Sequence, residues 1–392
     1  MLNRRILRVK AFQTLYAFQQ CKASNQNLAY DWIKAQFLPD LNSMEVQDKV
    51  KLRKEAEQCI RLFDAQLEGN PHEDGEHSPK INNMAKAALV QFKKQNEKDL
   101  EFLSNNMVTA AERIPSLYLL SIAILIGFGE HLEKELDKRK KLGNKGNSLA
   151  GESNLAKNKV LVFLKEKSPI EQEFVRHHVF REEIADEIRQ WFREHVKSQE
   201  DYLEYSKNPS PSWEDDMEIL QTLLKKVVFK NDTILSFFQE KDINWSENRP
   251  VVRSLALKVL KNLDGEGLPS EEFLPELAIN WEDDKEFFQN IFNLSVRSEK
   301  EFSGLIAEKA KNWDIERIAQ TDKVILTMAL TEMVNFPSIP VKVTINEFID
   351  ISKTYSTPKS KQFVNGLLDV LAKELTDSGK IRKSGRGLID NK

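Results

Sequence analysis

The chain has 392 residues, of which 40% are apolar, enough to bury more than one core. Its 58 basic and 61 acidic side chains nearly cancel, which excludes a protein that attracts nucleic acid or an anionic membrane through its overall charge. Two cysteines, Cys21 and Cys59, are too few for a disulfide framework and lack metal-ligand spacing, so a reducing cytoplasm fits best. Apolar residues at three- and four-residue intervals, with few glycines and prolines, predict an all-α fold.

The first 24 residues predict an arginine-rich helix. Arg4, Arg5, Arg8 and Lys10 fall within seven residues, and no acidic residue precedes Asp31. The first turn of a helix disfavours cations by about 0.3 to 1 kcal/mol each. A partner that carries phosphates would explain this arrangement, and so would a solvated, frayed terminus.

Residues 25–280 read as helices interrupted by two linkers, near 69–80 and 138–159, where glycine and polar residues gather. Between the linkers, Ile114–Gly129 is the longest apolar run. It is shorter than the roughly 20 residues that cross a bilayer, and Pro115 interrupts it. We expect a buried core helix there and no membrane segment.

One internal repeat appears when residues 213–249 are set against residues 281–317. Twelve of the 37 aligned positions are identical, including both tryptophans of each copy and the Glu-Asp-Asp that follows the first. Aspartates before an apolar helical run suit a helix N-terminus. Each copy therefore predicts a capped helix followed by a short link into another helix, unless the likeness of two amphipathic helices is accidental.

Three short-linked helices are predicted after Trp313. The prolines of Pro337–Pro340 end the first helix. Thr344–Glu347 has the spacing of a capping box that opens the second helix. Thr357–Pro358 opens the third, with proline at the first helical position. Together they predict a compact helical bundle.

Residues 377–392 form a basic tail with two glycines after Lys380. This composition predicts a disordered segment, which could add non-specific phosphate contacts or have no role.

The motifs TDKVIL, VTINEF and FVNGLLD follow Trp313 and Arg317 in this order, and they resemble the C-terminal half of the NusB family of transcription antitermination factors. RRILRVKAFQTLYAF is similar to the family's first helix, and residues 283–309 resemble the last helix of its N-terminal subdomain. The resemblance covers residues 1–24 and 281–376. It implies a NusB-like helical bundle of two subdomains, split by a helical insertion at 25–280.

The resemblance also implies a function. NusB proteins pair with ribosomal protein S-ten in its second role as NusE, and the pair binds the boxA element of nascent RNA to keep RNA polymerase elongating. A non-catalytic, cytoplasmic adaptor is therefore expected, with no cofactor.

In the family, the first helix and the turn before the last helix contact RNA. Cations that meet phosphates and aromatic rings that stack on bases suit single-stranded RNA. Tyr16, Tyr355 and Phe363 have a rival role as core aromatics. The candidates that the resemblance carries over are Arg4, Arg5, Arg8, Tyr16, Tyr355, Lys359, Lys361 and Phe363.

Two further positions bear on partners. Asp322 matches an acidic position in the family's surface for S-ten, although capping of its own helix is an equal alternative. Lys359 stands where some relatives carry an acidic residue, which raises the positive charge of the turn.

Other functions find less support. The sequence has no phosphate-binding or nucleophile motif, and the adjacent His177 and His178 would point to different helix faces, which disfavours a metal site. The ribosomal-RNA cytosine methyltransferases carry a NusB-like domain ahead of a catalytic domain, but the tail after Leu375 is too short to supply one. A helical scaffold that binds only protein remains the alternative.

Overall fold

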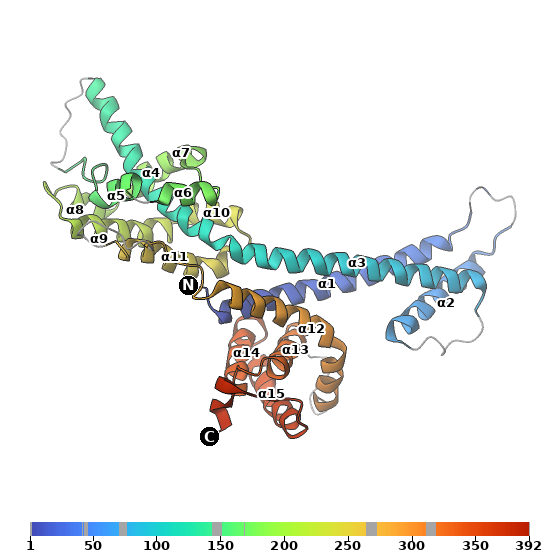
Figure 1. Ribbon diagram of the computed structural model, residues 1–392. Helices are drawn as coiled ribbons and strands as arrows, with labels where there is room; N and C mark the ends of the chain where they lie inside the picture. Colours follow the sequence, from blue (N-terminus) through green and yellow to red (C-terminus); the bar gives the residue numbers. More distant parts are fainter. Residues whose placement is uncertain are drawn as a thin grey trace. The chain divides into compact units, whose positions relative to one another are not determined.

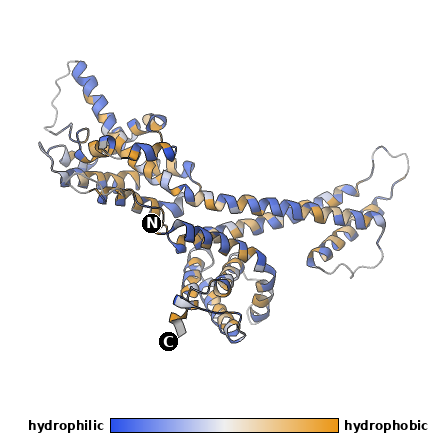
Figure 2. Ribbon diagram, in the orientation of Figure 1, coloured by the Kyte–Doolittle hydropathy of each residue, from blue (hydrophilic) through white to orange (hydrophobic). Residues whose placement is uncertain are grey.

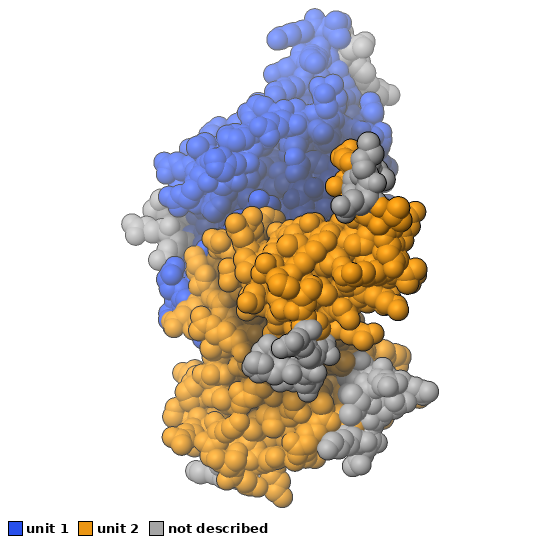
Figure 3. Space-filling view, turned by 90° about the vertical axis from the view of Figure 1, so that its right-hand side faces the viewer, with its two compact units in different colours: residues 1–6, 109–284 blue, residues 7–108, 285–392 orange. Residues whose placement is uncertain are grey.

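The computed structural model describes residues 2–40, 42, 46–69, 77–142, 151–167, 169–263, 273–310 and 319–391. These residues form helices joined by turns, with no strand among them, which confirms the all-α prediction (Figure 1). Helices that carry apolar and polar residues on different faces recur along the chain (Figure 2). The chain forms two compact units (Figure 3). Unit 1 contains residues 1–6 and 109–284, and unit 2 contains residues 7–108 and 285–392.

Unit 2 contains the predicted C-terminal bundle, in which each of its three helices packs on the other two. The first helix, α13, is buried along most of its length and stops two residues before Pro337, as predicted. The helices of this unit are α1 (Arg4–Gln36), α2 (Lys49–Glu68), α3 (Pro79–Glu112), α12 (Trp281–Lys309), α13 (Gln320–Asn335), α14 (Val341–Tyr355) and α15 (Ser360–Asp377). The first three residues of α1, the last four of α3 and the first four of α12 belong to unit 1.

Two predicted helix starts in the bundle differ from the structure. Helix α14 begins at Val341, directly after Pro340, so Thr344 lies inside the helix and the predicted capping box is wrong. The Thr344 hydroxyl instead donates to Glu332 Oε1 at 2.7 Å in the bundle core. Helix α15 begins at Ser360, two residues after Pro358, because a turn precedes it.

The C-terminal tail is folded onto the bundle, so the prediction of a disordered segment at 377–392 is wrong for the described residues. Ile381 is buried and its amide donates to the Leu375 carbonyl at 2.9 Å. The Ser384 amide donates to the Pro337 carbonyl at 3.0 Å, and a short 3-10 helix follows at Gly385–Asn391. One apolar anchor and these backbone bonds offset the entropy lost by ordering a polar segment.

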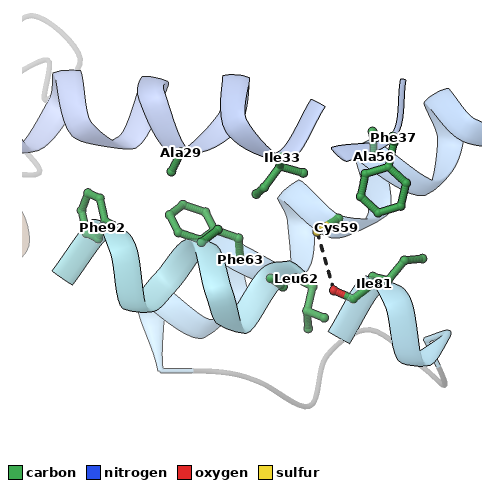
Figure 4. Close-up of a cluster of buried hydrophobic side chains, with 11 residues drawn as sticks. Ala29, Ile33, Phe37, Ala56, Cys59, Leu62, Phe63, Ile81 and Phe92 are labelled. Carbon is green, nitrogen blue, oxygen red and sulfur yellow. Dashed lines mark hydrogen bonds between the residues drawn. The ribbon is translucent and has the colours of Figure 1, made fainter. Parts of the chain in front are cut away.

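Helix α1 extends beyond the predicted residue 24 and packs with α2 and the first half of α3 around a second apolar cluster (Figure 4). Cys59 is fully buried there, with its thiol 3.6 Å from the Ile81 carbonyl oxygen, and burial raises its pKa to about 11. Both cysteines are free thiols. The residues of the cluster are Ala29, Ile33, Phe37, Ala56, Cys59, Leu62, Phe63, Ile81, Ala85, Ala88 and Phe92.

Unit 1 is built on α4 (Ile114–Lys141), which contains the longest apolar run. By length and composition, one helical stretch, Pro79–Lys141, could cross a membrane, but 72% of its apolar window is buried inside the protein. The prediction of a buried core helix is therefore confirmed. The other α-helices of this unit are α5 (Lys159–Lys167), α6 (Ile170–Arg176), α7 (Ala185–Trp191), α8 (Glu200–Tyr205), α9 (Trp213–Leu223), α10 (Asp232–Lys241) and α11 (Trp245–Lys261).

The second predicted linker is partly ordered. Within 138–159, the first residues complete α4, residues 143–150 lie outside the described residues, and residues 151–159 pack into unit 1. Asn158 is fully buried there, and its amide donates to the Asp216 carbonyl at 2.9 Å. The linker prediction is therefore wrong for 151–159. Buried asparagine side chains in this segment form hydrogen bonds to backbone carbonyls, which allows a polar segment to pack in the interior. Most of the first linker, 70–76, lies outside the described residues.

The two repeat copies share their beginnings and then differ. Helix α9 starts at Trp213 with a capping box between Ser212 and Asp215, and α12 starts at Trp281 with three acids in its first turn. In the first copy, α9 continues through a π-helical turn at Leu224–Val228 and the helix is then broken at residues 229–231, whereas α12 continues unbroken to Lys309. Trp313 and Arg317 of the second copy lie outside the described residues.

Candidate nucleic-acid interface

Segments from the two ends of the sequence meet within unit 2. The rings of Phe12 on α1 and Tyr355 at the end of α14 lie 5.5 Å apart between centroids, inclined by 50°. Farther along α1, Gln19 is hydrogen-bonded to Gln320 at the start of α13. The first helix therefore lies against the end of α14 and the start of α13.

Arg8 lies in the interior, at 4% exposure. Its Nε and Nη2 donate to the two carboxylate oxygens of Glu332 at 2.6 and 2.9 Å, and its guanidinium carbon lies 5.2 Å from the centroid of the Phe287 ring. Glu332 is fully buried and also accepts the Thr344 hydroxyl. The charged groups of Arg8 are therefore occupied by the protein, and this arginine joins α1 to the bundle.

Aromatic and cationic side chains remain at the surface of the same junction. Tyr16 is half-buried one helical turn after Phe12 and shares its side of α1. Tyr355 is half-buried, and Lys359 and Lys361 are exposed on either side of Ser360. Such a set can meet phosphates and stacked bases together.

Phe363, by contrast, is 8% exposed and belongs to the apolar side of α15. The structure thus places this ring in the core, the rival position named for it above. Burial removes the two-sided ring surface on which a base could stack.

The first two arginines belong to unit 1. Arg4 is half-buried, and its Nε lies 2.9 Å from Asp284 Oδ1. Arg5 is exposed at the start of α1. An ion pair with Asp284 reduces the charge that Arg4 presents to a phosphate.

Asp322, the candidate partner contact, faces inward at 4% exposure. Its two carboxylate oxygens accept hydrogen bonds from Ser356 Oγ at 2.6 Å and from Ser360 Oγ at 2.7 Å. Sequence reasoning named neither serine. The available signal was their spacing of four residues around Thr357–Pro358, because short hydroxyl side chains often close turns.

The chain matches the NusB family model over residues 250–373, so the likeness takes in most of α11 in addition to residues 281–373 of the expected region 281–376. It is 42% identical over 105 residues to the transcription antitermination protein NusB of Salinibacter ruber, covering 27% of this chain and 66% of that protein. It is 36% identical over 152 residues to the protein of the same name from Chloroherpeton thalassium, and this match covers 36% of this chain and 70% of that protein.

A third relative, the transcription antitermination protein NusB of Koribacter versatilis, is 35% identical over 136 residues, which cover 34% of this chain and 92% of that protein. No solved structure matches the chain. The shared region contains the α12–α15 part of unit 2, in which the junction described above lies. On its matched residues, its helical fold and these relatives, the chain belongs to the NusB family.

Proposed function

We propose that the chain is a cytoplasmic transcription antitermination factor that binds boxA-type single-stranded RNA together with ribosomal protein S-ten, as a non-catalytic adaptor to RNA polymerase. The relatives with which it shares its bundle are named for transcription antitermination. The observation that carries the RNA part is the junction in unit 2. There, half-buried Tyr16 and Tyr355 lie on helices joined by the Phe12–Tyr355 contact, next to Lys359 in the α14–α15 turn and Lys361 in the first turn of α15.

The chemistry of this junction fits an unpaired strand. Aromatic rings stack on bases of any identity, at about 1 to 3 kcal/mol per base, and lysines track the phosphates. The formal net charge of the chain is only −3, so attraction of RNA depends on local cations such as Lys359 and Lys361. We assign Arg4 and Arg5 as further phosphate contacts, Arg8 as the residue that fixes α1, and Phe363 as packing beneath the turn.

The replacement of both turn lysines tests the RNA proposal. Two lost phosphate contacts should lower the salt slope of binding by about 1.4, because each contact to a single strand contributes about 0.7. Lys359→Ala/Lys361→Ala should therefore bind a boxA-like RNA more weakly, and the difference should shrink as salt rises. Filter-binding titrations at several salt concentrations, with a scrambled RNA beside the boxA-like one, measure both quantities.

Lys373→Ala is the matched control, because Lys373 is exposed on the same helix but about 18 Å farther along it. It should leave the slope nearly unchanged. An unchanged slope in the double variant would remove the turn from the RNA site. Retention of S-ten by a chain that binds no RNA, in a pull-down, would favour the protein scaffold over the adaptor.

A further inference from the structure

A closed cluster of hydroxyl groups surrounds the buried Asp322 carboxylate. Besides the two bonds to Ser356 and Ser360, the Thr321 hydroxyl lies 2.8 Å from Ser356 Oγ, the two serine oxygens are 3.0 Å apart, and the Thr357 hydroxyl lies 2.7 Å from Ser360 Oγ. The cluster thus joins the start of α13 to both sides of the α14–α15 turn.

The two serines lie at either end of the α14–α15 turn, which contains Lys359, and Lys361 follows in the first turn of α15. Ser356 follows Tyr355 directly, and Ser360 lies between Lys359 and Lys361. The Ser360 amide donates to the Thr357 carbonyl at 2.9 Å and closes the turn itself, and the Asp322 cluster ties this turn to α13 through side-chain hydrogen bonds. The Asp322 carboxylate is therefore bonded to the residue that follows Tyr355 and to the residue between the two lysines.

We propose that Asp322 is a positioning residue for RNA binding, which holds the α14–α15 turn in the geometry that presents Tyr355, Lys359 and Lys361 together. This inference rests on the proposed RNA function. Asp322 acts through the two serines and does not touch the RNA. Hydrogen bonds to an ionised acceptor are about twice as strong as neutral ones, and the burial of Asp322 protects them from competition by water.

A positioning role and a purely electrostatic role of Asp322 predict opposite changes in RNA affinity when the carboxylate is removed. Removal of a negative charge beside a phosphate-binding surface should tighten RNA binding if charge alone mattered. Removal of the carboxylate should instead weaken binding, because a loosened turn must be ordered again when RNA binds. For Asp322→Ala we expect about a tenfold weaker affinity from this loss of preorganisation and a lower salt slope.

The experiment compares four variants of the full chain with the wild type. Asp322→Ala and Ser356→Ala/Ser360→Ala break the cluster from its two sides. Asp322→Asn keeps the shape and can accept from one serine while donating to the other. Asp369→Ala removes an exposed acid from α15 and leaves the cluster intact. Each variant is assayed by RNA titration and by amide hydrogen exchange of residues 356–363 without RNA, below its measured melting temperature.

The proposal predicts weaker RNA binding and faster exchange in both cluster-breaking variants, near wild-type behaviour in Asp322→Asn, and equal or tighter binding in Asp369→Ala. Asp322→Ala with unchanged exchange, or with binding as tight as that of Asp369→Ala, would overturn it. If the wild type itself binds no RNA, the RNA function fails, and the exchange data alone then decide whether Asp322 holds the turn.

Discussion

At the scale of single residues, the position of Arg8 shows what local sequence leaves open. Arg4 and Arg8 are four residues apart and both suit a cationic helix face, yet only Arg8 is buried against Glu332, which lies 324 positions away in the chain. A list of cations cannot identify which of them has such a distant partner. Likewise, the sequence predicted that Asp322 lies at a helix start, but it did not reveal the hydrogen bonds that Asp322 accepts from Ser356 and Ser360 at the α14–α15 turn.

The buried pair gives a prediction on stability. Arg8→Met should lower the free energy of unfolding by about 3 to 5 kcal/mol, because it leaves the Glu332 charge buried and without its main partner. Urea denaturation followed by circular dichroism measures this loss. Lys22→Met is the control on the same helix, since Lys22 and Glu299 form a pair that is about one third exposed, and such pairs contribute at most about 1 kcal/mol.

A further variant separates the charge from the packing. Arg8→Met/Glu332→Leu should recover most of the loss, because an apolar pair of similar volume avoids the cost of the buried charge. If Arg8→Met lowered the free energy of unfolding no more than Lys22→Met does, Arg8 would not hold α1 to the bundle.

At the scale of elements, the features that could be predicted from sequence were helices with a long apolar run and helix ends set by prolines. The apolar run of α4 and the prolines that follow α13 identified a core helix and a helix end. Starts were harder, because Thr344–Glu347 has a capping-box spacing although Pro340 already sets the first turn of α14. The ordering of 151–159 depends on contacts with residues more than 45 positions away, such as the Asn154 bond to the Tyr205 carbonyl, which no local composition reveals.

Two glycines test these elements in opposite directions. A side chain at Gly151 would overlap Asn154 and the Asn208 carbonyl, whereas one at Gly304 would meet nothing within 4 Å. Gly151→Ala should therefore lower stability by about 1 to 3 kcal/mol through overpacking. Gly304→Ala should raise it by about 0.5 to 1 kcal/mol, because Gly304 lies inside α12 and alanine favours helix.

Thermal unfolding of both variants beside the wild type measures these shifts. If Gly151→Ala unfolded at the same temperature as the wild type, residues 151–159 would not be packed into unit 1.

At the scale of the whole molecule, the fold class and the meeting of the chain's two ends could be predicted, because apolar periodicity and the order of motifs persist through any insertion. The extent of that insertion could not. Helix α1 runs on to Gln36 and builds a separate cluster with α2 and α3 in unit 2, while residues 109–284 form the body of unit 1. A division into units depends on contacts between distant segments, which composition does not encode.

We propose that α1 and the α14–α15 turn form one surface for unpaired RNA. Hydrogen exchange of the full chain with and without a boxA-like single strand tests it most directly, since binding slows exchange where it suppresses local opening. A single RNA surface should show added protection both in residues 7–16 and in residues 355–363, with none in α2. Protection of only one of these segments, or protection confined to residues 109–284, would contradict it.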